Sequence, residues 1–80
     1  AQQRAVTADL RKAVRDHEKQ IEKLTAQRET LEQRLADPQV YGGSTSKLME
    51  LQLRHSETKA KLAATEETWL ALSERLEVAD

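Results

Sequence analysis

The sequence has no cysteine and no phenylalanine, and it holds only one proline, two glycines and two aromatic residues, Tyr41 and Trp69. Without cysteine, a disulfide framework and a cysteine-ligated metal are excluded, which agrees with a reducing compartment such as the cytoplasm. The longest apolar run, residues 69–72, is far shorter than the roughly 20 residues that span a bilayer. No signal peptide is recognisable, so we expect a cytoplasmic protein with no membrane partner.

Neither sign of charge predominates. The 13 basic and 14 acidic residues give a net charge of −1, so no bulk field attracts the chain to nucleic acid or to an anionic membrane. Any such binding needs a local basic patch. Eighty residues form at most one small domain, too small for a large catalytic core. Because the chain starts at Ala1 and its helical pattern begins almost at once, we expect it to be part of a larger protein.

Strong helix formers dominate what is present, and both halves of the chain carry a heptad pattern in alternating steps of three and four residues. The first set is Leu10, Val14, His17, Ile21, Leu24, Arg28, Leu31 and Leu35. The second set is Leu48, Leu51, His55, Thr58, Leu62, Thr65, Trp69, Leu72 and Leu76. Each half is therefore predicted to be a long helix with one narrow apolar stripe, over about residues 5–36 and 47–78.

The stretch LADPQVYGG, residues 35–43, separates the two halves. Pro38 disfavours helix at Asp37, and Asp37 is well suited to cap a new turn that has Pro38 as its first residue. We therefore predict a short helical or 3₁₀ turn here. Gly42 and Gly43 are expected to reverse the chain through positive φ angles.

Two further expectations concern the ends of this corner, residues 37–46. Ser44 or Ser46 is expected to cap the second helix, which should start near Lys47. Val40 and Tyr41 are expected to fold back over the last apolar layer. Tyr41 has two readings, as a plug of the tip or as an exposed ring offered to a partner.

These features predict an all-α fold, an antiparallel two-helix coiled-coil hairpin that occupies residues 1–80 as a single domain. Ile21 should meet Leu62, and Arg28 should meet His55 in a polar layer. The first helix begins basic and the second ends acidic, which supports this pairing. We expect a monomeric hairpin, with a dimeric coiled coil or a domain-swapped form as the alternative.

No constellation of catalytic, cofactor or metal-binding residues is recognisable. The two glycines are not followed by the Lys-Ser/Thr of a phosphate loop. His17 and His55 lie at different levels of the predicted pair and are expected to be seam residues, not metal ligands. Glu66 and Glu67 point about 100° apart on a helix and do not converge. We predict that Trp69 packs in the seam; the alternative is a stacking platform for a base.

A basic cluster in the first helix has two readings. It pairs with the acidic end of the second helix, or it forms a stripe that contacts nucleic-acid phosphates. Its members, the candidate nucleic-acid-binding residues, are Arg4, Arg11, Lys12, Arg15, Lys19 and Lys23. A second, weaker candidate set in the second helix is Lys47, Arg54, Lys59 and Lys61.

The segments LRKAV, HEKQIEKLTAQ, LADPQVY and EETWLALSERLE together resemble the C-terminal domain of ABC-F proteins of the Uup and YheS type, from about Thr7 to Glu77. These are ATP-binding cassette ATPases without transmembrane segments. The resemblance implies a hairpin that follows two cassettes in one cytoplasmic chain, with ATP and Mg bound by the parent cassettes and not by this segment. It also implies a role on the ribosome and nucleic-acid binding, to DNA in the Uup case.

The sequence departs from the resemblance at Gly42 and Gly43, where family members often carry charge, and in its near-neutral net charge. The function hypotheses are therefore two. The first is a non-catalytic accessory domain that helps its parent ATPase bind DNA, ribosomal RNA or tRNA. The alternative is a structural, protein-binding or dimerising coiled coil without nucleic-acid binding.

Overall fold

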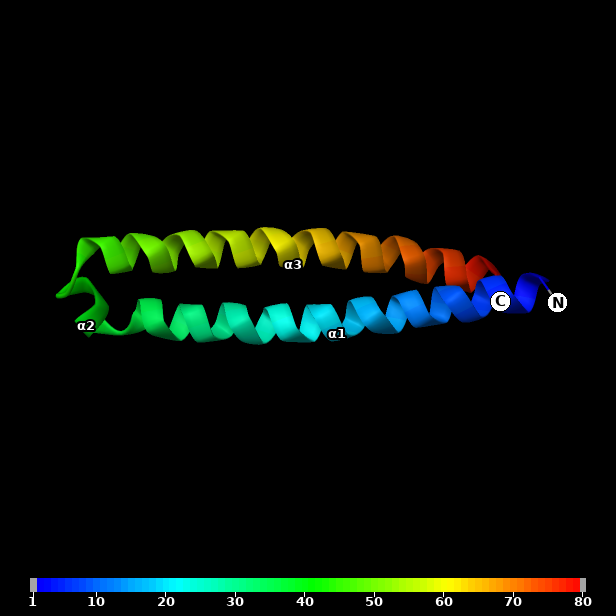
Figure 1. The fold of residues 1–80 in the computed structure, drawn as a ribbon, viewed down its shortest axis with the longest axis horizontal. Coiled ribbons are helices and arrows are strands. Elements are labelled where there is room, and N and C mark those ends of the chain that lie inside the picture. Colours follow the sequence, from blue (N-terminus) through cyan, green and yellow to red (C-terminus); the bar gives the residue numbers. More distant parts are fainter. Residues whose placement is uncertain (1, 80) are drawn as a thin grey trace.

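The computed structural model describes residues 2–79, and these residues are helical except at the corner. The helices are α1 (Gln2–Ala36), α2 (Pro38–Tyr41) and α3 (Thr45–Ala79). Helices α1 and α3 lie side by side and run in opposite directions, so both termini lie at one end, with α2 at the other (Figure 1). The Cα atoms span 62 × 14 × 14 Å, a thin rod. The predicted all-α class is confirmed.

The heptad sets form the seam between α1 and α3. Every member of both sets is buried or half-buried, whereas most of the residues between them are exposed. Leu10 and Leu62 are the most deeply placed, with 8% and 4% of their surface exposed. The heptad pattern therefore identified the buried face of each helix correctly. Among the residues whose burial is described, Leu10 and Leu62 alone are buried, so the two helices enclose a thin seam and not a thick core.

Two polar seam residues, His17 and Thr65, form hydrogen bonds within their own helix. His17 Nδ1 lies 2.7 Å from the carbonyl oxygen of Ala13, which only accepts, so the ring donates from this nitrogen. The Thr65 hydroxyl donates to the carbonyl of Lys61 at 2.8 Å. These bonds explain how polar side chains are tolerated in the seam, because a buried polar group without a partner is costly.

Asp37 starts the corner as predicted. Its backbone is extended, with φ −74° and ψ 120°, as expected for a residue before proline. Its carboxylate accepts a hydrogen bond from the backbone N–H of Gln39 at 3.0 Å, and Pro38 is the first residue of α2. The N–H of Asp37 donates to the Arg34 carbonyl at 3.2 Å and joins the corner to the end of α1.

The prediction of positive φ at Gly42 and Gly43 is wrong. Among the described residues no glycine has a positive φ, and Gly42 is right-handed with φ −89° and ψ −4°. Helix α2 itself redirects the chain, so left-handed residues are not needed. A Cβ atom would lie 3.8 Å from its nearest neighbour at Gly42 and 3.6 Å at Gly43, which is ordinary contact.

The two ends of the corner are fixed differently. The Tyr41 hydroxyl donates to the carbonyl of Leu35 at 2.6 Å and so satisfies one of the free carbonyls at the end of α1, while the ring stays exposed. Helix α3 starts two residues before the predicted Lys47. The Leu48 N–H donates to the Ser44 carbonyl at 3.2 Å, which places Ser44, not Ser46, at the cap position.

Within residues 2–79, neither long helix has a stretch apolar enough to cross a membrane.

Candidate nucleic-acid interface

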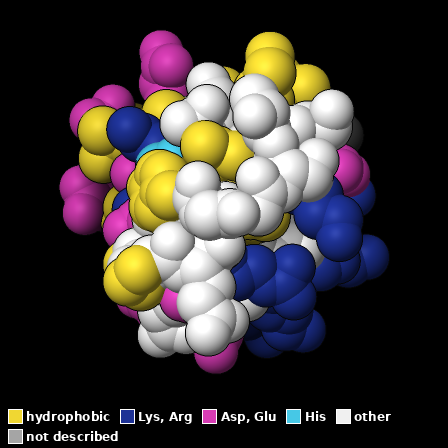
Figure 2. Space-filling view, turned by 90° about the vertical axis from the view of Figure 1, so that its left-hand side faces the viewer, with side chains coloured by type: hydrophobic (Ala, Val, Ile, Leu, Met, Phe, Trp, Pro, Cys, Tyr) yellow, Lys and Arg dark blue, Asp and Glu magenta, His cyan; other side chains and the backbone are white. Residues whose placement is uncertain are grey.

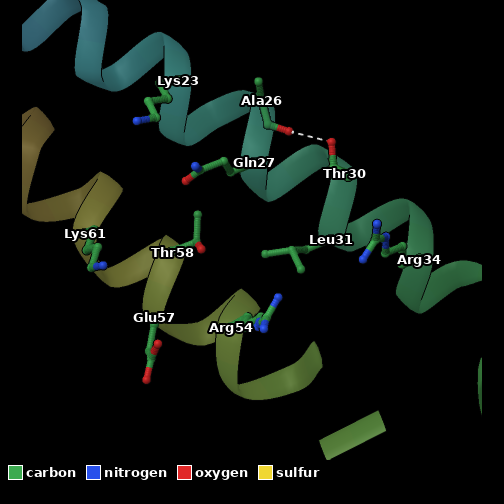
Figure 3. A pocket seen from close by; sticks show the side chains of 10 residues that line it. All are labelled: Lys23, Ala26, Gln27, Thr30, Leu31, Arg34, Arg54, Glu57, Thr58 and Lys61. Carbon is green, nitrogen blue, oxygen red and sulfur yellow. Dashed lines mark hydrogen bonds between the residues drawn. The ribbon is translucent and has the colours of Figure 1, made fainter. Parts of the chain in front are cut away.

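A shallow groove of about 590 Å³ lies between α1 and α3, in the half of the rod nearer to α2. Leu31 forms its floor and points toward α3, and the residues around it are almost all polar (Figure 3). The groove is lined by Lys23, Ala26, Gln27, Thr30, Leu31 and Arg34 from α1 and by Arg54, Glu57, Thr58 and Lys61 from α3.

The groove is basic. It has four cations, Lys23, Arg34, Arg54 and Lys61, and one carboxylate, Glu57, which points away from α1 in Figure 3. Arg54 also donates to Glu50 at 2.8 Å, one helical turn away, and both side chains are more than half exposed. A pair of this kind contributes only about 0.2–0.5 kcal/mol, so Arg54 remains available to another anion. We call these four cations the basic flank.

A second shallow groove continues the basic flank toward the open end. It shares Lys23, Gln27 and Lys61 with the first groove and adds only uncharged residues. The additional lining residues are Gln20, Leu24, Ala64 and Thr65. Viewed from the α2 end, Lys and Arg side chains gather on one side of the rod, and most visible Asp and Glu side chains lie on the other (Figure 2).

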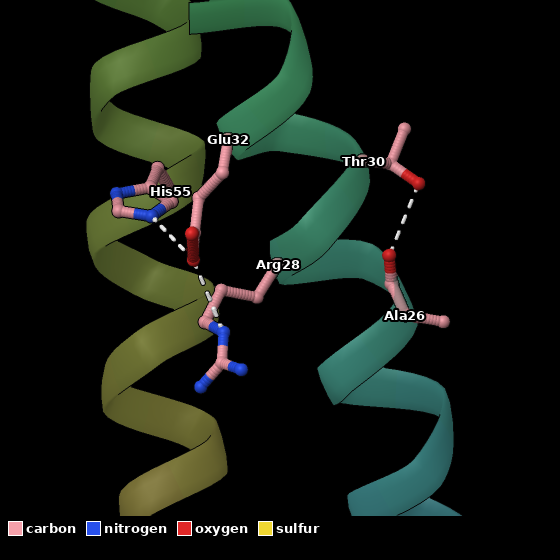
Figure 4. A network of polar contacts seen from close by, with 5 residues as sticks. All are labelled: Ala26, Arg28, Thr30, Glu32 and His55. Atoms are coloured by element: carbon pink, nitrogen blue, oxygen red, sulfur yellow. Dashed lines mark hydrogen bonds and ion pairs between the residues drawn. The ribbon is translucent and has the colours of Figure 1, made fainter. Parts of the chain in front are cut away.

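The opposite flank is neutralised internally. Glu32 lies about 200° around α1 from Thr30, which lines the groove. One Glu32 carboxylate oxygen lies 3.1 Å from Arg28 Nε and 3.5 Å from His55 Nε2, so Glu32 joins both helices (Figure 4). Neither contact is aligned as a hydrogen bond. The predicted Arg28–His55 layer is thus present, with Glu32 added to it. We call these three residues the mixed flank.

The six stripe residues predicted from the sequence are all exposed, but they do not share one surface. A stripe with a residue every four positions winds about 120° around the helix between Arg11 and Lys23. Arg11 and Arg15 border a pocket at the open end with Val14 and Leu76, whereas Lys23 lies in the basic groove. The stripe of Arg4, Arg11, Lys12, Arg15, Lys19 and Lys23 remains a prediction.

Two of the four residues of the weaker candidate set lie in the groove, and Lys47 and Lys59 do not. Arg54 and Lys61 of this set line the groove, together with Arg34, which the sequence reasoning missed. Arg34 follows Gln27 by seven residues, one heptad, and therefore lies on the same side of the seam. In an antiparallel pair the residues on this side of α1 face Arg54 and Lys61 of α3. A heptad assignment carried to the flanking positions would have found it.

The aromatic residues lie away from the groove. Trp69 is half-buried, and its Nε1 is buried with no hydrogen-bond partner among the described residues. It lies beside a separate pocket of about 400 Å³, lined also by Glu18, Ile21, Glu66 and Leu70. The prediction that Trp69 is a seam residue agrees with this position.

Within residues 2–79 no group of three or more His, Asp or Glu side chains is placed to hold a metal ion.

The arrangement is that of an elongated helix-pair domain. It presents side chains along two flanks, and one flank carries the basic groove. Residues 6–74 match the family model of the ABC transporter C-terminal domain. The chain therefore belongs to the ABC transporter C-terminal domain family, as an accessory domain of an ABC protein. Comparison with the curated proteins and with the solved structures gives no significant match.

Proposed function

We propose that this chain is a non-catalytic accessory domain of a cytoplasmic ABC-F ATPase, an antiparallel coiled-coil hairpin that helps its parent bind nucleic acid. DNA, ribosomal RNA and tRNA are the candidate ligands. ATP and Mg belong to the parent cassettes in this proposal, and the chain itself binds neither.

The observation that carries the proposal is the gathering of Lys and Arg on one side of the rod, on a chain whose net charge is −1. A surface of this kind attracts phosphate locally although the whole molecule is nearly neutral. Membership of the ABC family supports the accessory role. The exposed cations of the α1 stripe, Arg4 to Lys23, remain candidates for the contact.

A titration of the 80-residue chain with duplex DNA and with a structured RNA tests this proposal. We expect weak binding, with a dissociation constant of about 10⁻⁴ to 10⁻⁶ M near physiological salt, that tightens steeply as salt is lowered. Phosphate contacts release counterions, so a plot of log K against log salt should be linear with a negative slope. Absence of binding at about 50 mM salt would contradict the proposal.

A protein-binding function is the second candidate, and exposed apolar residues on α3 favour it. Met49, Leu53 and Leu70 are each more than half exposed, and Met49 and Leu70 lie three heptads apart on one side of the helix. Sedimentation of the chain over a concentration series distinguishes a monomeric hairpin from a dimer. A dimer in which the Met49→Lys variant is monomeric would favour this second function.

A further inference from the structure

We infer that the basic flank binds the phosphate backbone of double-stranded nucleic acid without reading its bases, and that it makes a larger contribution than the outer stripe of α1. This inference rests on the proposed function and gives it a site and a ligand class. It follows from the charge of the groove, its length, the place of the aromatic residues and the thickness of the rod.

The groove carries more cations than the other surfaces between the helices; the pocket at the open end has two, Arg11 and Arg15, and no carboxylate among the described residues that line it. The lining of the groove has four cations and one carboxylate. The pocket beside Trp69 has two carboxylates, Glu18 and Glu66, and no cation. The mixed flank contains two basic side chains that share one carboxylate, Glu32, whereas in the groove only Arg54 has a carboxylate partner among the described residues, Glu50. A phosphate approaching the rod is therefore attracted to the groove and repelled near Trp69.

The cations are spread along the rod and over both helices. Lys23 and Arg34 are separated by about 16 Å along α1, and Arg54 and Lys61 by about 10 Å along α3. The major groove of B-form DNA is about 12 Å wide, so the set is long enough to reach phosphates on both of its edges. Gln27 and Thr58 add side-chain donors between the cations, whereas the Thr30 hydroxyl donates to the carbonyl of Ala26 at 3.0 Å.

A single strand fits this surface less well. Proteins that hold single strands without sequence preference stack the bases on aromatic rings. The two aromatic residues of the chain are Trp69, which lines the separate pocket, and Tyr41, whose hydroxyl is bonded to Leu35 at the α2 end. Neither lines the basic grooves. The surface offers charge and hydrogen bonds but no ring on which a base stacks.

The rod as a whole is too thick to enter the major groove. Its Cα atoms alone extend 14 Å in both short directions, which exceeds the roughly 12 Å width of that groove before side chains are added. The four cations line a groove between the two helices, so they approach a duplex with both helices together. We therefore expect contacts to the backbone and binding that is independent of sequence.

Two variants that lose the same number of charges test the inference. The groove variant is R34Q/R54Q/K61Q, and the stripe variant is K12Q/R15Q/K19Q, which keeps Lys23. Each is titrated with duplex DNA, duplex RNA and the corresponding single strands at about 50 mM and about 200 mM salt. Glutamine is close to Arg and Lys in helix propensity, and circular dichroism verifies that both variants keep the helical content of the unmodified chain.

The groove variant should bind duplex about tenfold more weakly at the lower salt, and its salt slope should be smaller by about two to three. The stripe variant should lose about threefold or less. Duplex should bind more tightly than single strands, and different duplex sequences should bind alike. The DNA and RNA arms identify which duplex is preferred.

Different failures have different meanings. If the stripe variant loses as much affinity as the groove variant, or more, the assignment to the basic flank is wrong while the proposed function stands. Tighter binding of single strands than of duplex overturns the duplex assignment alone. If the unmodified chain binds none of these ligands, the inference and the proposed function both fail.

Discussion

The basic flank and the mixed flank lie on the same two helices and over the same seam, yet they differ in what they offer to solution. On the mixed flank Glu32 contacts Arg28 and His55, so the charges are balanced within the rod. On the basic flank four cations are opposed by Glu57 in the groove lining and by Glu50, which pairs with Arg54. The net charge of a coiled coil therefore says little about its surfaces, because neighbouring heptad positions face opposite sides.

Replacement of Leu62 by alanine should have the largest effect, because Leu62 is the most buried of the described residues. Buried Leu→Ala changes cost about 2–5 kcal/mol, and in this thin seam we expect about 2–3 kcal/mol. Urea unfolding followed by circular dichroism measures it. Leu53→Ala on the exposed side of α3 is the control and should stay within about 0.5 kcal/mol. Equal effects of the two changes would contradict a seam at Leu62.

The double variant R28L/H55L should change the stability of the helix pair without changing its binding to duplex, and so distinguish the roles of the two flanks. It replaces the half-buried polar layer by leucine, and changes of this type often stabilise by about 1–4 kcal/mol. Because Arg28 and His55 are partly exposed, we expect a gain of about 1–2 kcal/mol in the free energy of unfolding. Binding to duplex should not change, because both residues lie outside the basic flank. Weaker duplex binding by a stabilised variant would show that the mixed flank takes part in the contact.

Glu57→Gln should give the smallest effect. It increases the net positive charge of the basic flank, because Glu57 is the only carboxylate that lines the larger groove. Removing this negative charge should tighten duplex binding by about two- to threefold at low salt, and less at high salt. The control Glu22→Gln removes an equal charge from an exposed position of α1 that lines neither of the two grooves. An equal gain from both variants would indicate a general effect of net charge instead of a groove.

The sequence predicted the helices and their buried faces well because these depend on local information. Spacings of three and four identify the seam, and Pro38 after Asp37 identifies the corner. The conformation of Gly42 was predicted wrongly. Glycine permits a positive φ but does not require it, and the four-residue helix α2 already turns the chain.

The candidate site was harder to predict, because it depends on which flanking positions face each other across the seam. Sequence reasoning grouped cations that are neighbours along one helix, and so it joined Arg15 to Lys19 and Lys23. The groove instead joins Lys23 and Arg34 to Arg54 and Lys61 of the other helix. Glu32 was missed for the same reason, since its two contacts reach its own helix and the opposite one.

The hydrogen bond from the Tyr41 hydroxyl to the Leu35 carbonyl indicates where the hinge would lie if α1 and α3 separated. Together with the Asp37–Arg34 bond it ties α2 to α1, while the hydrogen bonds of Gly42 and Leu48 each stay within one side of the corner. Among the described residues no hydrogen bond crosses Gly43 and Ser44, so α2 is held to α3 there by packing contacts alone. If the two arms ever separate, α2 should travel with α1, and the hinge should lie after the second glycine.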